Sequence, residues 1–371
     1  MPSETKSALF QPIRVGEVVV QHRVVLAPLT RVRGYNDHVP GPLAALYYAQ
    51  RASEPGTLLI TEATFISGPA SGYPNIPGIY TDAQIEGWKE VTNAVHAKRS
   101  FIYLQIWALG RAAMPQILAM EGHELVGAAN IPLKENAQQG HADPRPVTIP
   151  EIKAYVQMFA TAAKNAIKAG FDGVEVHSAN GYLIDQFLQD VSNTREDAYG
   201  GSIENRARFG LEILDAVIET IGASKTGVRI SPWSEFRDMR MTDPVPTFSY
   251  YVTEIRKRNI AYLSVIEPGV GGDEVVESTN GSNDFIRKIW GESPYITSGG
   301  YTRERALKTA EESNVLIAFG RSYLANPDLP RRLRENLPMT QATRSKYYLV
   351  GNHTPDGYTD WDFADSLVEA V

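Results

Sequence analysis

The sequence of 371 residues predicts an α/β protein in which strands and helices alternate eight times. Short β-branched or apolar runs alternate with longer segments of helical periodicity, which is the pattern of a parallel sheet with helical crossovers. No G-x-G-x-x-G motif stands between a strand and a helix, as an open dinucleotide-binding sheet would require. Eight such units in a row therefore favour a single (β/α)8 barrel, the TIM-barrel fold, over an open sheet or two domains.

Eight short runs are compact enough to be strands that are buried on both faces. They are Val24 to Leu26, Leu58 to Thr61, Phe101 to Ile106, Gly173 to His177, Val228 to Ser231, Tyr262 to Val265, Tyr295 to Ser298 and Val315 to Phe319. Before them, Ile13 to Val15 and Glu17 to Val20 flank Gly16 and predict an N-terminal hairpin that closes the bottom of the barrel.

One helix can be predicted with both of its ends, and a second with its C-terminal end. Thr148 to Glu151 has the spacing of a capping box, an apolar stripe follows, and Gly170 stops the helix. In the next unit, Gly222 ends a helix whose apolar stripe consists of Leu214, Val217, Ile218 and Ile221. Strands before and after each helix make these segments crossover units.

Two segments depart from the repeating pattern. Residues 108–147, from Ala108 to Val147, are expected to form an excursion over one barrel mouth. Residues 268–283 include the run Gly269 to Gly272, which we interpret as a flexible loop after the sixth strand. Both segments are expected to set specificity. We expect one domain, 1–371, with its core at about 9–340 and a C-terminal segment, 341–371, that packs near the active-site mouth.

The composition excludes several classes of function. With 36 Lys and Arg against 43 Asp and Glu, the chain has no basic patch for nucleic acid or an anionic membrane surface. The absence of cysteine excludes disulfides, thiolate zinc sites, iron–sulfur clusters and a cysteine nucleophile. The histidines lack metal-ligand spacing, so no metal is expected. Without a signal-peptide core or a spanning apolar run, we expect a cytoplasmic protein.

Polar residues end several of the predicted strands, where barrels of this type carry their active sites. Thr30, Gln105, His177 and Arg229 stand at or just after such ends. Any one of them alone is more often a structural hydrogen-bonding residue than a catalytic group. Their convergence from four strands on one mouth is what indicates a site.

The segment from His177 to Tyr182 holds the densest group of polar side chains. If Asn180 begins a helical turn, His177 and Asn180 direct nitrogen donors at one point, as is needed to polarise a substrate carbonyl oxygen. Tyr182 keeps its proton at neutral pH and can act as a general acid. On these residues alone, a buried structural histidine with supporting partners stays an open alternative.

Glycine-rich turns follow the last two predicted strands, at Ser298-Gly299-Gly300 and Phe319-Gly320-Arg321. Barrels frequently bind a phosphate with the backbone N–H groups of these two loops, and Arg321 can add a bidentate contact. Together with the polar ends of the first, third and fifth strands, such a phosphate site indicates flavin mononucleotide (FMN) across the mouth. Arg229 would then stabilise the negative charge of reduced flavin.

Five motifs spread over the chain, from Leu9 to about Asp365, resemble the old yellow enzyme family of flavin-dependent ene-reductases. They are Leu26 to Arg31, Gln105 to Arg111, His177 to Leu188, Asn193 to Phe209 with Tyr199-Gly200-Gly201-Ser202 inside it, and Ala318 to Arg321 continuing to Pro330. In its details the chain looks most like fungal members, including relatives that act on ergot-alkaloid aldehyde intermediates.

The resemblance implies a TIM barrel with non-covalent FMN and with NADPH, or less often NADH, as reductant. The residues that it places on FMN are Pro28, Leu29, Thr30, Ala63, Gln105, His177, Arg229, Gly299, Gly300, Gly320 and Arg321. His177 and Asn180 would bind the carbonyl oxygen of an α,β-unsaturated aldehyde or ketone, and Tyr182 would protonate its α-carbon after hydride reaches the β-carbon. The other residues matched to the substrate cavity are Tyr73, Trp107, Phe236 and Tyr348.

Departures from the family pattern concern the cavity walls. Ala63 stands where glycine is common, Trp233 where tyrosine is usual, and Tyr347 where phenylalanine is usual. Relatives that isomerise instead of reducing can carry phenylalanine at the proton donor, so Tyr182 favours net reduction.

Two other functions stay open on the sequence. One is a flavin-free barrel lyase or aldolase acting on a phosphorylated substrate, although no lysine ends a strand where a Schiff base would form. The other is a non-catalytic flavin-binding protein. For the enzyme we expect a small-molecule enone or enal and a nicotinamide as partners, without nucleic acid or membrane, in a monomer or homodimer.

Overall fold

Eight parallel strands close into a barrel in the computed structural model, which describes residues 7–272, 274–275 and 281–365. The strands are β3 (Val24–Leu26), β4 (Leu58–Ile60), β6 (Phe101–Trp107), β9 (Gly173–Ser178), β10 (Thr226–Ile230), β11 (Tyr262–Ile266), β14 (Tyr295–Ser298) and β15 (Leu316–Phe319). Each pairs with its neighbour along the chain, β15 pairs with β3, and the ring is complete. The predicted barrel and all eight predicted strands are confirmed.

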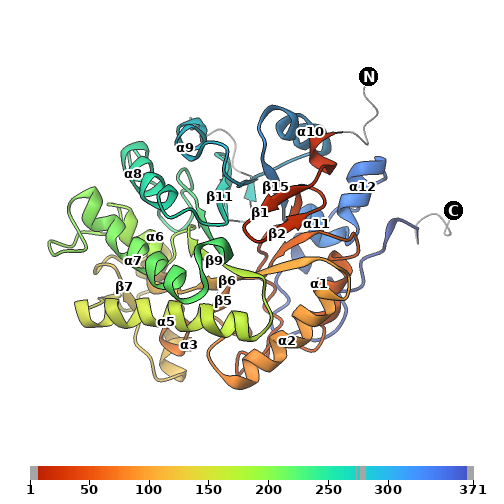
Figure 1. Ribbon diagram of the computed structural model, residues 1–371. Coiled ribbons are helices and arrows are strands. Elements are labelled where there is room, and N and C mark those ends of the chain that lie inside the picture. Colours follow the sequence, from red (N-terminus) through yellow and green to blue (C-terminus); the bar gives the residue numbers. More distant parts are fainter. Residues whose placement is uncertain (1–6, 273, 276–280, 366–371) are drawn as a thin grey trace.

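Helices surround the strands (Figure 1) and bury the outer face of the barrel. They are α1 (Ala44–Arg51), α2 (Asp82–His96), α5 (Ile149–Lys168), α6 (Leu183–Leu188), α7 (Ile203–Ile221), α8 (Val245–Arg256), α9 (Asp284–Trp290), α10 (Arg303–Glu312), α11 (Arg321–Ala325) and α12 (Leu329–Glu335). The capping box that begins α5 is present, with Thr148 N donating to Glu151 at 2.7 Å. Gly222 ends α7 with φ of 91°, as predicted.

The N-terminal hairpin closes the bottom of the barrel, as predicted. Strands β1 (Ile13–Val15) and β2 (Val18–Val20) are antiparallel. Val15 and Val20 are fully buried and belong to the same apolar cluster as Leu58 and Tyr103 from the barrel strands. Gly16 takes φ of 55° at the turn, where a Cβ would lie 1.9 Å from the Ser224 carbonyl oxygen. The turn therefore needs glycine both for its conformation and for this close approach.

The segments that depart from the strand–helix repeat contain short elements of their own. They are β5 (Thr64–Phe65), α3 (Pro115–Met120), β7 (Val126–Gly127), α4 (Lys134–Gln138), β8 (Arg145–Pro146), β12 (Val270–Gly271) and β13 (Glu274–Val275), with 3₁₀ turns at Ala8–Phe10, Gly68–Ala70, Gly110–Ala112, Ala223–Lys225 and Arg344–Lys346. Strands β12 and β13 pair antiparallel within the loop that was predicted after the sixth strand. Residues 273 and 276–280 of that loop lie outside the described part of the chain.

Two buried arginines after β3 hold the C-terminal segment against the barrel. Arg31 donates to the carbonyl oxygens of Lys346, Tyr347 and Gly357 at 2.8 to 3.4 Å. Arg33 donates to those of Asn352, Thr354 and Asp356 at 2.7 to 3.1 Å. This packing brings Tyr347 and Tyr348 to the cavity at the mouth of the barrel.

In the described part of the chain, none of the helices has the length and apolar character needed to cross a membrane.

Candidate active site

A cavity of about 1060 Å³ opens at the carboxyl ends of the barrel strands. Every residue that the sequence analysis assigned to FMN or substrate lines it: Pro28, Leu29, Thr30, Ala63, Tyr73, Gln105, Trp107, His177, Asn180, Tyr182, Arg229, Phe236, Gly299, Gly300, Gly320, Arg321 and Tyr348. Their common location is a property of the fold, because parallel strands in a barrel end on the same face. Their individual roles stay predictions.

A buried polar group lies where the third, fourth and fifth barrel strands meet the cavity. Gln105 Nε2 donates to Glu175 Oε1 at 2.7 Å, which fixes the orientation of the Gln105 amide. Burial raises the pKa of Glu175, whereas the nearby Arg229 guanidinium acts in the opposite direction. Burial in turn lowers the pKa of Arg229, and Glu175 opposes this shift. The result is an amide held at the edge of the cavity by a buried carboxyl group, which also acts electrostatically on the Arg229 guanidinium.

His177 ends β9 with a neutral imidazole. Its pKa lies well below 6.5, because the ring is buried and because the charges of Arg229 and Arg237 act on it. A neutral imidazole has one N–H donor and one acceptor nitrogen. The Nδ1 atom is buried without a hydrogen-bond partner, so it remains available to a bound molecule.

Asn180 does not begin a helical turn, so this part of the prediction was wrong. The residue takes φ of 58°, in the left-handed region, and α6 begins only at Leu183. The tight turn is fixed by hydrogen bonds from Asn180 N to Ser231 Oγ at 2.8 Å and from Gly181 N to Asp185 Oδ2 at 2.9 Å. The turn nevertheless places Asn180 on the cavity wall with His177, and its buried Oδ1 has no partner.

The two glycine turns form the opposite end of the cavity. Gly299 has φ of 143°, and a Cβ there would lie 2.9 Å from Glu267 Cβ. Gly300 has φ of 60°, and Gly320 stands just before Arg321, which begins α11. The absence of side chains at these positions leaves backbone N–H groups accessible next to a guanidinium, which is suited to a phosphate.

An aromatic wall faces the strand ends. Trp107 packs edge to face against Tyr182, with ring centroids 4.6 Å apart, and Tyr182 packs in the same way against His177 at 5.1 Å. Tyr73 lies 6.0 Å from Trp107 and donates from its hydroxyl to the Ala112 carbonyl oxygen at 2.8 Å. Phe236 and Tyr348 come from two loops distant in sequence. This half of the cavity fits a flat, mostly apolar molecule.

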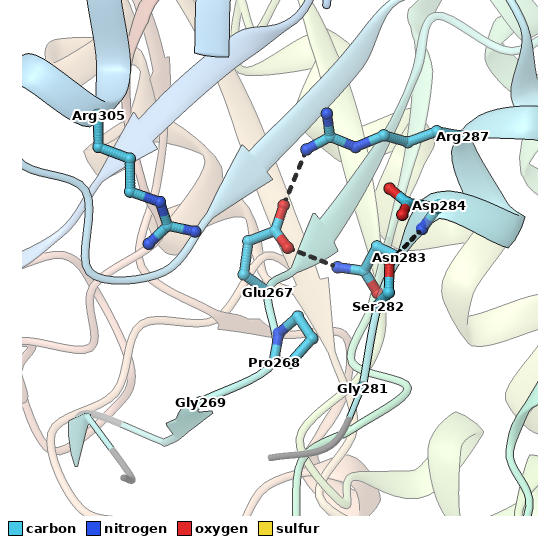
Figure 2. A pocket seen from close by; sticks show the side chains of 9 residues that line it. All are labelled: Glu267, Pro268, Gly269, Gly281, Ser282, Asn283, Asp284, Arg287 and Arg305. Atoms are coloured by element: carbon cyan, nitrogen blue, oxygen red, sulfur yellow. Dashed lines mark hydrogen bonds and ion pairs between the residues drawn. The ribbon is translucent and has the colours of Figure 1, made fainter. Parts of the chain in front are cut away.

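A smaller pocket of about 370 Å³ lies beside the loop that follows β11 (Figure 2). Three of its charged side chains already have partners within the protein. The Glu267 carboxylate accepts from Arg287 at 3.0 Å and from Asn283 at 3.1 Å, and Arg305 donates to the Gly299 carbonyl oxygen at 2.9 Å. These contacts support the turn that carries Gly299, so we interpret the pocket as part of the structural framework.

The residues of the large cavity fit FMN on three independent features. The Arg229 Nε atom, like His177 Nδ1, is buried without a partner on the protein. The glycine turns leave room for a phosphate, and the strand-end amide and hydroxyl groups can bond the polar edge of a flavin. Arg229 and Gln105 would therefore hold the pyrimidine end, and Gly299, Gly300, Gly320 and Arg321 the phosphate.

Two charged residues of the site were missed by the sequence analysis. Glu175 could have been found, because it is a charged residue in the middle of an otherwise apolar strand, Gly173 to His177. Arg237 lies in a loop after β10 and also lines the cavity. No periodicity or motif distinguishes it, and only the fold brings it to Tyr182.

Comparison with known proteins agrees with this architecture. The family model described as "NADH:flavin oxidoreductase / NADH oxidase family" matches residues 8–340. A chanoclavine-I aldehyde reductase of Penicillium roqueforti, fgaOx3, is 47% identical over 98% of both chains. A protein of Epichloe festucae var. lolii named as a probable inactive reductase, easA, is 43% identical over 98% of this chain and 97% of its own. The old yellow enzyme of Pichia sp. AKU4542 superposes with a TM-score of 0.89 at 39% identity, covering 97% of this chain and 94% of its own.

The match to the family model spans the barrel, and the relatives cover almost the whole chain. The resemblance inferred from five motifs is therefore confirmed, together with FMN as cofactor and NADPH or NADH as reductant. The chain belongs to the NADH:flavin oxidoreductase / NADH oxidase family and is an FMN- and NAD(P)H-dependent oxidoreductase of the old yellow enzyme type.

Proposed function

We propose that the protein is an ene-reductase that reduces the C=C bond of α,β-unsaturated aldehydes and ketones. The observation that carries this proposal is one cavity that brings His177 and Asn180, which can donate to a carbonyl oxygen, beside the hydroxyl-bearing Tyr182. The aldehyde reductase activity named for the relative from Penicillium roqueforti supports a conjugated carbonyl compound as substrate. The apolar aromatic wall supports a flat substrate.

Bound FMN, reduced by the nicotinamide, would supply the hydride for the β-carbon of the substrate. His177 and Asn180 donate hydrogen bonds to the substrate carbonyl oxygen, where negative charge develops. Because His177 is neutral, its imidazole donates through one N–H group and keeps that proton during the reaction. Tyr182 then gives its hydroxyl proton to the α-carbon.

The substrate and the nicotinamide would use the same cavity in turn. The aromatic wall formed by Tyr73, Trp107 and Phe236 offers ring faces for either molecule, and Arg229 and Gln105 face the cofactor end. The two half-reactions would therefore alternate, which allows each to be measured separately.

The substitution Tyr182→Phe tests the general acid directly. A positioned general acid contributes about 10²- to 10⁴-fold in rate, so enone reduction is expected to slow by that order. The rate at which NADPH reduces the flavin should stay nearly unchanged, because that half-reaction requires no proton from Tyr182. Stopped-flow absorbance of the flavin separates the two rates. An equal loss in both half-reactions would contradict the role.

A second candidate, a flavin-binding protein without catalysis, is favoured by one comparison. The relative from Epichloe festucae var. lolii is named a probable inactive reductase although it is 43% identical to this chain. Assays of NADPH and NADH oxidation against cyclic enones, enals and maleimides decide between the two. Turnover with any of them establishes an enzyme, whereas a yellow protein that oxidises neither nicotinamide with any acceptor supports the non-catalytic alternative.

A further inference from the structure

Arg237 places a positive charge on the ring of Tyr182. Its guanidinium carbon lies 4.8 Å from the centroid of the Tyr182 ring, 4.8 Å from that of Phe236 and 5.7 Å from that of Tyr73. The residue takes φ of 62°, and its carbonyl oxygen accepts from Arg111 Nη2 at 3.1 Å. The loop backbone is thus held in an unfavourable conformation that directs this side chain into the cavity.

The charge of Arg237 lacks an acidic partner. Within residues 7–272, 274–275 and 281–365, no carboxylate forms an ion pair with it, and its Nε atom is buried without a hydrogen-bond partner. The adjacent Asp238 is engaged elsewhere, because its Oδ2 atom accepts from Lys134 N at 2.7 Å. By contrast, Arg240 in the same loop lies over Trp233 and pairs with Glu235 at 2.6 Å. A guanidinium that lies among aromatic rings without a counterion can stabilise an anion that forms or binds in the cavity.

We infer that Arg237 is a positioning residue whose charge is the counterion of the tyrosinate that Tyr182 becomes in each catalytic cycle. This inference rests on the proposed function, because it requires Tyr182 to give up a proton. It adds a residue that acts through Tyr182 and has no direct part in hydride transfer.

Hydride addition at the β-carbon leaves an enolate, whose electron pair forms the new C–H bond at the α-carbon with the proton of the Tyr182 hydroxyl. The O–H bond breaks, its electrons stay on the oxygen, and a tyrosinate remains next to the Arg237 guanidinium. A proton from water then restores the hydroxyl. A nearby cation favours the charged form of an acid, so Arg237 lowers the free energy of this intermediate state.

The other groups that face Tyr182 cannot take this role. His177 is neutral, since burial and the two arginine charges hold its pKa well below 6.5. Burial raises the pKa of Tyr73 to about 12, so Tyr73 is neutral too. Trp107 carries no charge, and Asp185 on α6 is an acid bonded to Gly181 N and Gln189. Arg229 is the other cation, and Glu175 acts on its pKa more strongly than Tyr182 does.

The test compares Arg237→Gln, which removes the charge, with Arg237→Lys, which keeps it, and uses a neutral cyclic enone as substrate. Arg240→Gln is the matched control, because Arg240 lies over an aromatic ring in the same loop but outside the cavity lining. We expect Arg237→Gln to slow flavin oxidation by the enone about tenfold or more. In the pH profile of this rate, the decline on the alkaline side should move to higher pH. Arg237→Lys should restore most of the rate, and flavin reduction by NADPH should change less than twofold.

Two further measurements separate this role from a structural one. In the Tyr182→Phe background, Arg237→Gln should cause no further loss, because the anion that it stabilises no longer forms. An ultraviolet difference titration, wild type minus Tyr182→Phe, reports tyrosinate without any turnover. The difference signal should appear at higher pH once Arg237→Gln is present in both proteins.

Several results would overturn the inference. Additive losses in the double variant, equal slowing of flavin reduction by NADPH, or an unchanged tyrosinate titration would each show that Arg237 does not act through Tyr182. A loss confined to carboxylate-bearing enones would instead assign Arg237 to an anionic substrate. If Tyr182→Phe itself reduces enones at the wild-type rate, the proposed proton transfer from Tyr182 fails first, and the titration still tests the contact between the two side chains.

Discussion

The cavity has two halves that are built in different ways. The flavin half consists of strand ends and the turns directly after them, such as Gln105 on β6, Arg229 on β10 and Gly299 after β14. The substrate half is supplied largely by loops and by the C-terminal segment, including Tyr73, Phe236 and Tyr348. The barrel fixes the positions of residues on strands. The positions of loop residues depend on contacts with residues far along the chain. The first half is therefore suited to a constant cofactor and the second to a changing substrate.

Among the substitutions that separate the two halves, the largest expected effect comes from His177, which lies between them. His177→Ala removes one donor to the developing negative charge on the carbonyl oxygen, and the loss of one such donor costs about 10²- to 10³-fold in rate. Enone reduction should fall by this factor while the flavin content, read from the visible spectrum, stays that of the wild type. His96→Ala, at the half-exposed end of α2, is the control. Loss of flavin together with activity would place His177 wholly in the flavin half.

A smaller effect is expected from Gly299→Val, which should break the flavin half alone. The new Cβ would lie 2.9 Å from Glu267 Cβ on a backbone with φ of 143°. Strain of this kind costs about 1–3 kcal/mol, which corresponds to roughly 10- to 100-fold weaker FMN binding if the turn moves away from the phosphate. Fluorescence titration of the deflavinated protein with FMN measures the affinity for FMN. Gly122→Val is the control, because Gly122 also has positive φ but a Cβ there would meet no atom within 4 Å. It shows how much of the effect comes from backbone strain alone and how much from the position of Gly299 in the site. Unchanged FMN affinity in Gly299→Val would refute the phosphate assignment.

The smallest effect is expected from Arg33→Met, which should disturb the substrate half alone. The substitution removes hydrogen bonds to three carbonyl oxygens of the C-terminal segment, at a cost of about 1–3 kcal/mol. Limited proteolysis within 341–365 should become faster, and KM for an enone should rise by less than about tenfold. FMN affinity should not change. The exposed Arg14→Met serves as the control, and weakened FMN binding in Arg33→Met would show that the halves are coupled.

The fold could be predicted from the sequence because each of its signals is local. Buried strands appear as short apolar runs, and the ends of α5 and α7 follow from a capping box and a glycine. Once the barrel is predicted, the location of strand-end residues such as Gln105 and Arg229 follows from topology alone. This explains why the residues of the flavin half were found together on one cavity.

The remaining details depend on contacts that local patterns do not contain. The turn at Asn180 is fixed by Ser231, 51 residues later, so spacing alone suggested a helical turn where the backbone is left-handed. Arg237 reaches Tyr182 only after a loop has folded back over the mouth. These features were missed or mispredicted for the same reason, namely that the deciding partner lies elsewhere in the chain.

The hydrogen bonds of Arg31 and Arg33 have a consequence for how this protein can change. All six of the acceptors are main-chain carbonyl oxygens, from Lys346 to Gly357. These hydrogen bonds recognise the course of the main chain, and both guanidiniums also lie over the ring of Tyr358, at 5.1 and 5.0 Å. Tyr347, Tyr348 and Val350, which reach the cavity from this segment, can be exchanged without detaching it. New substrate preferences can thus arise by substitution in the C-terminal segment while its hydrogen bonds to Arg31 and Arg33 are kept.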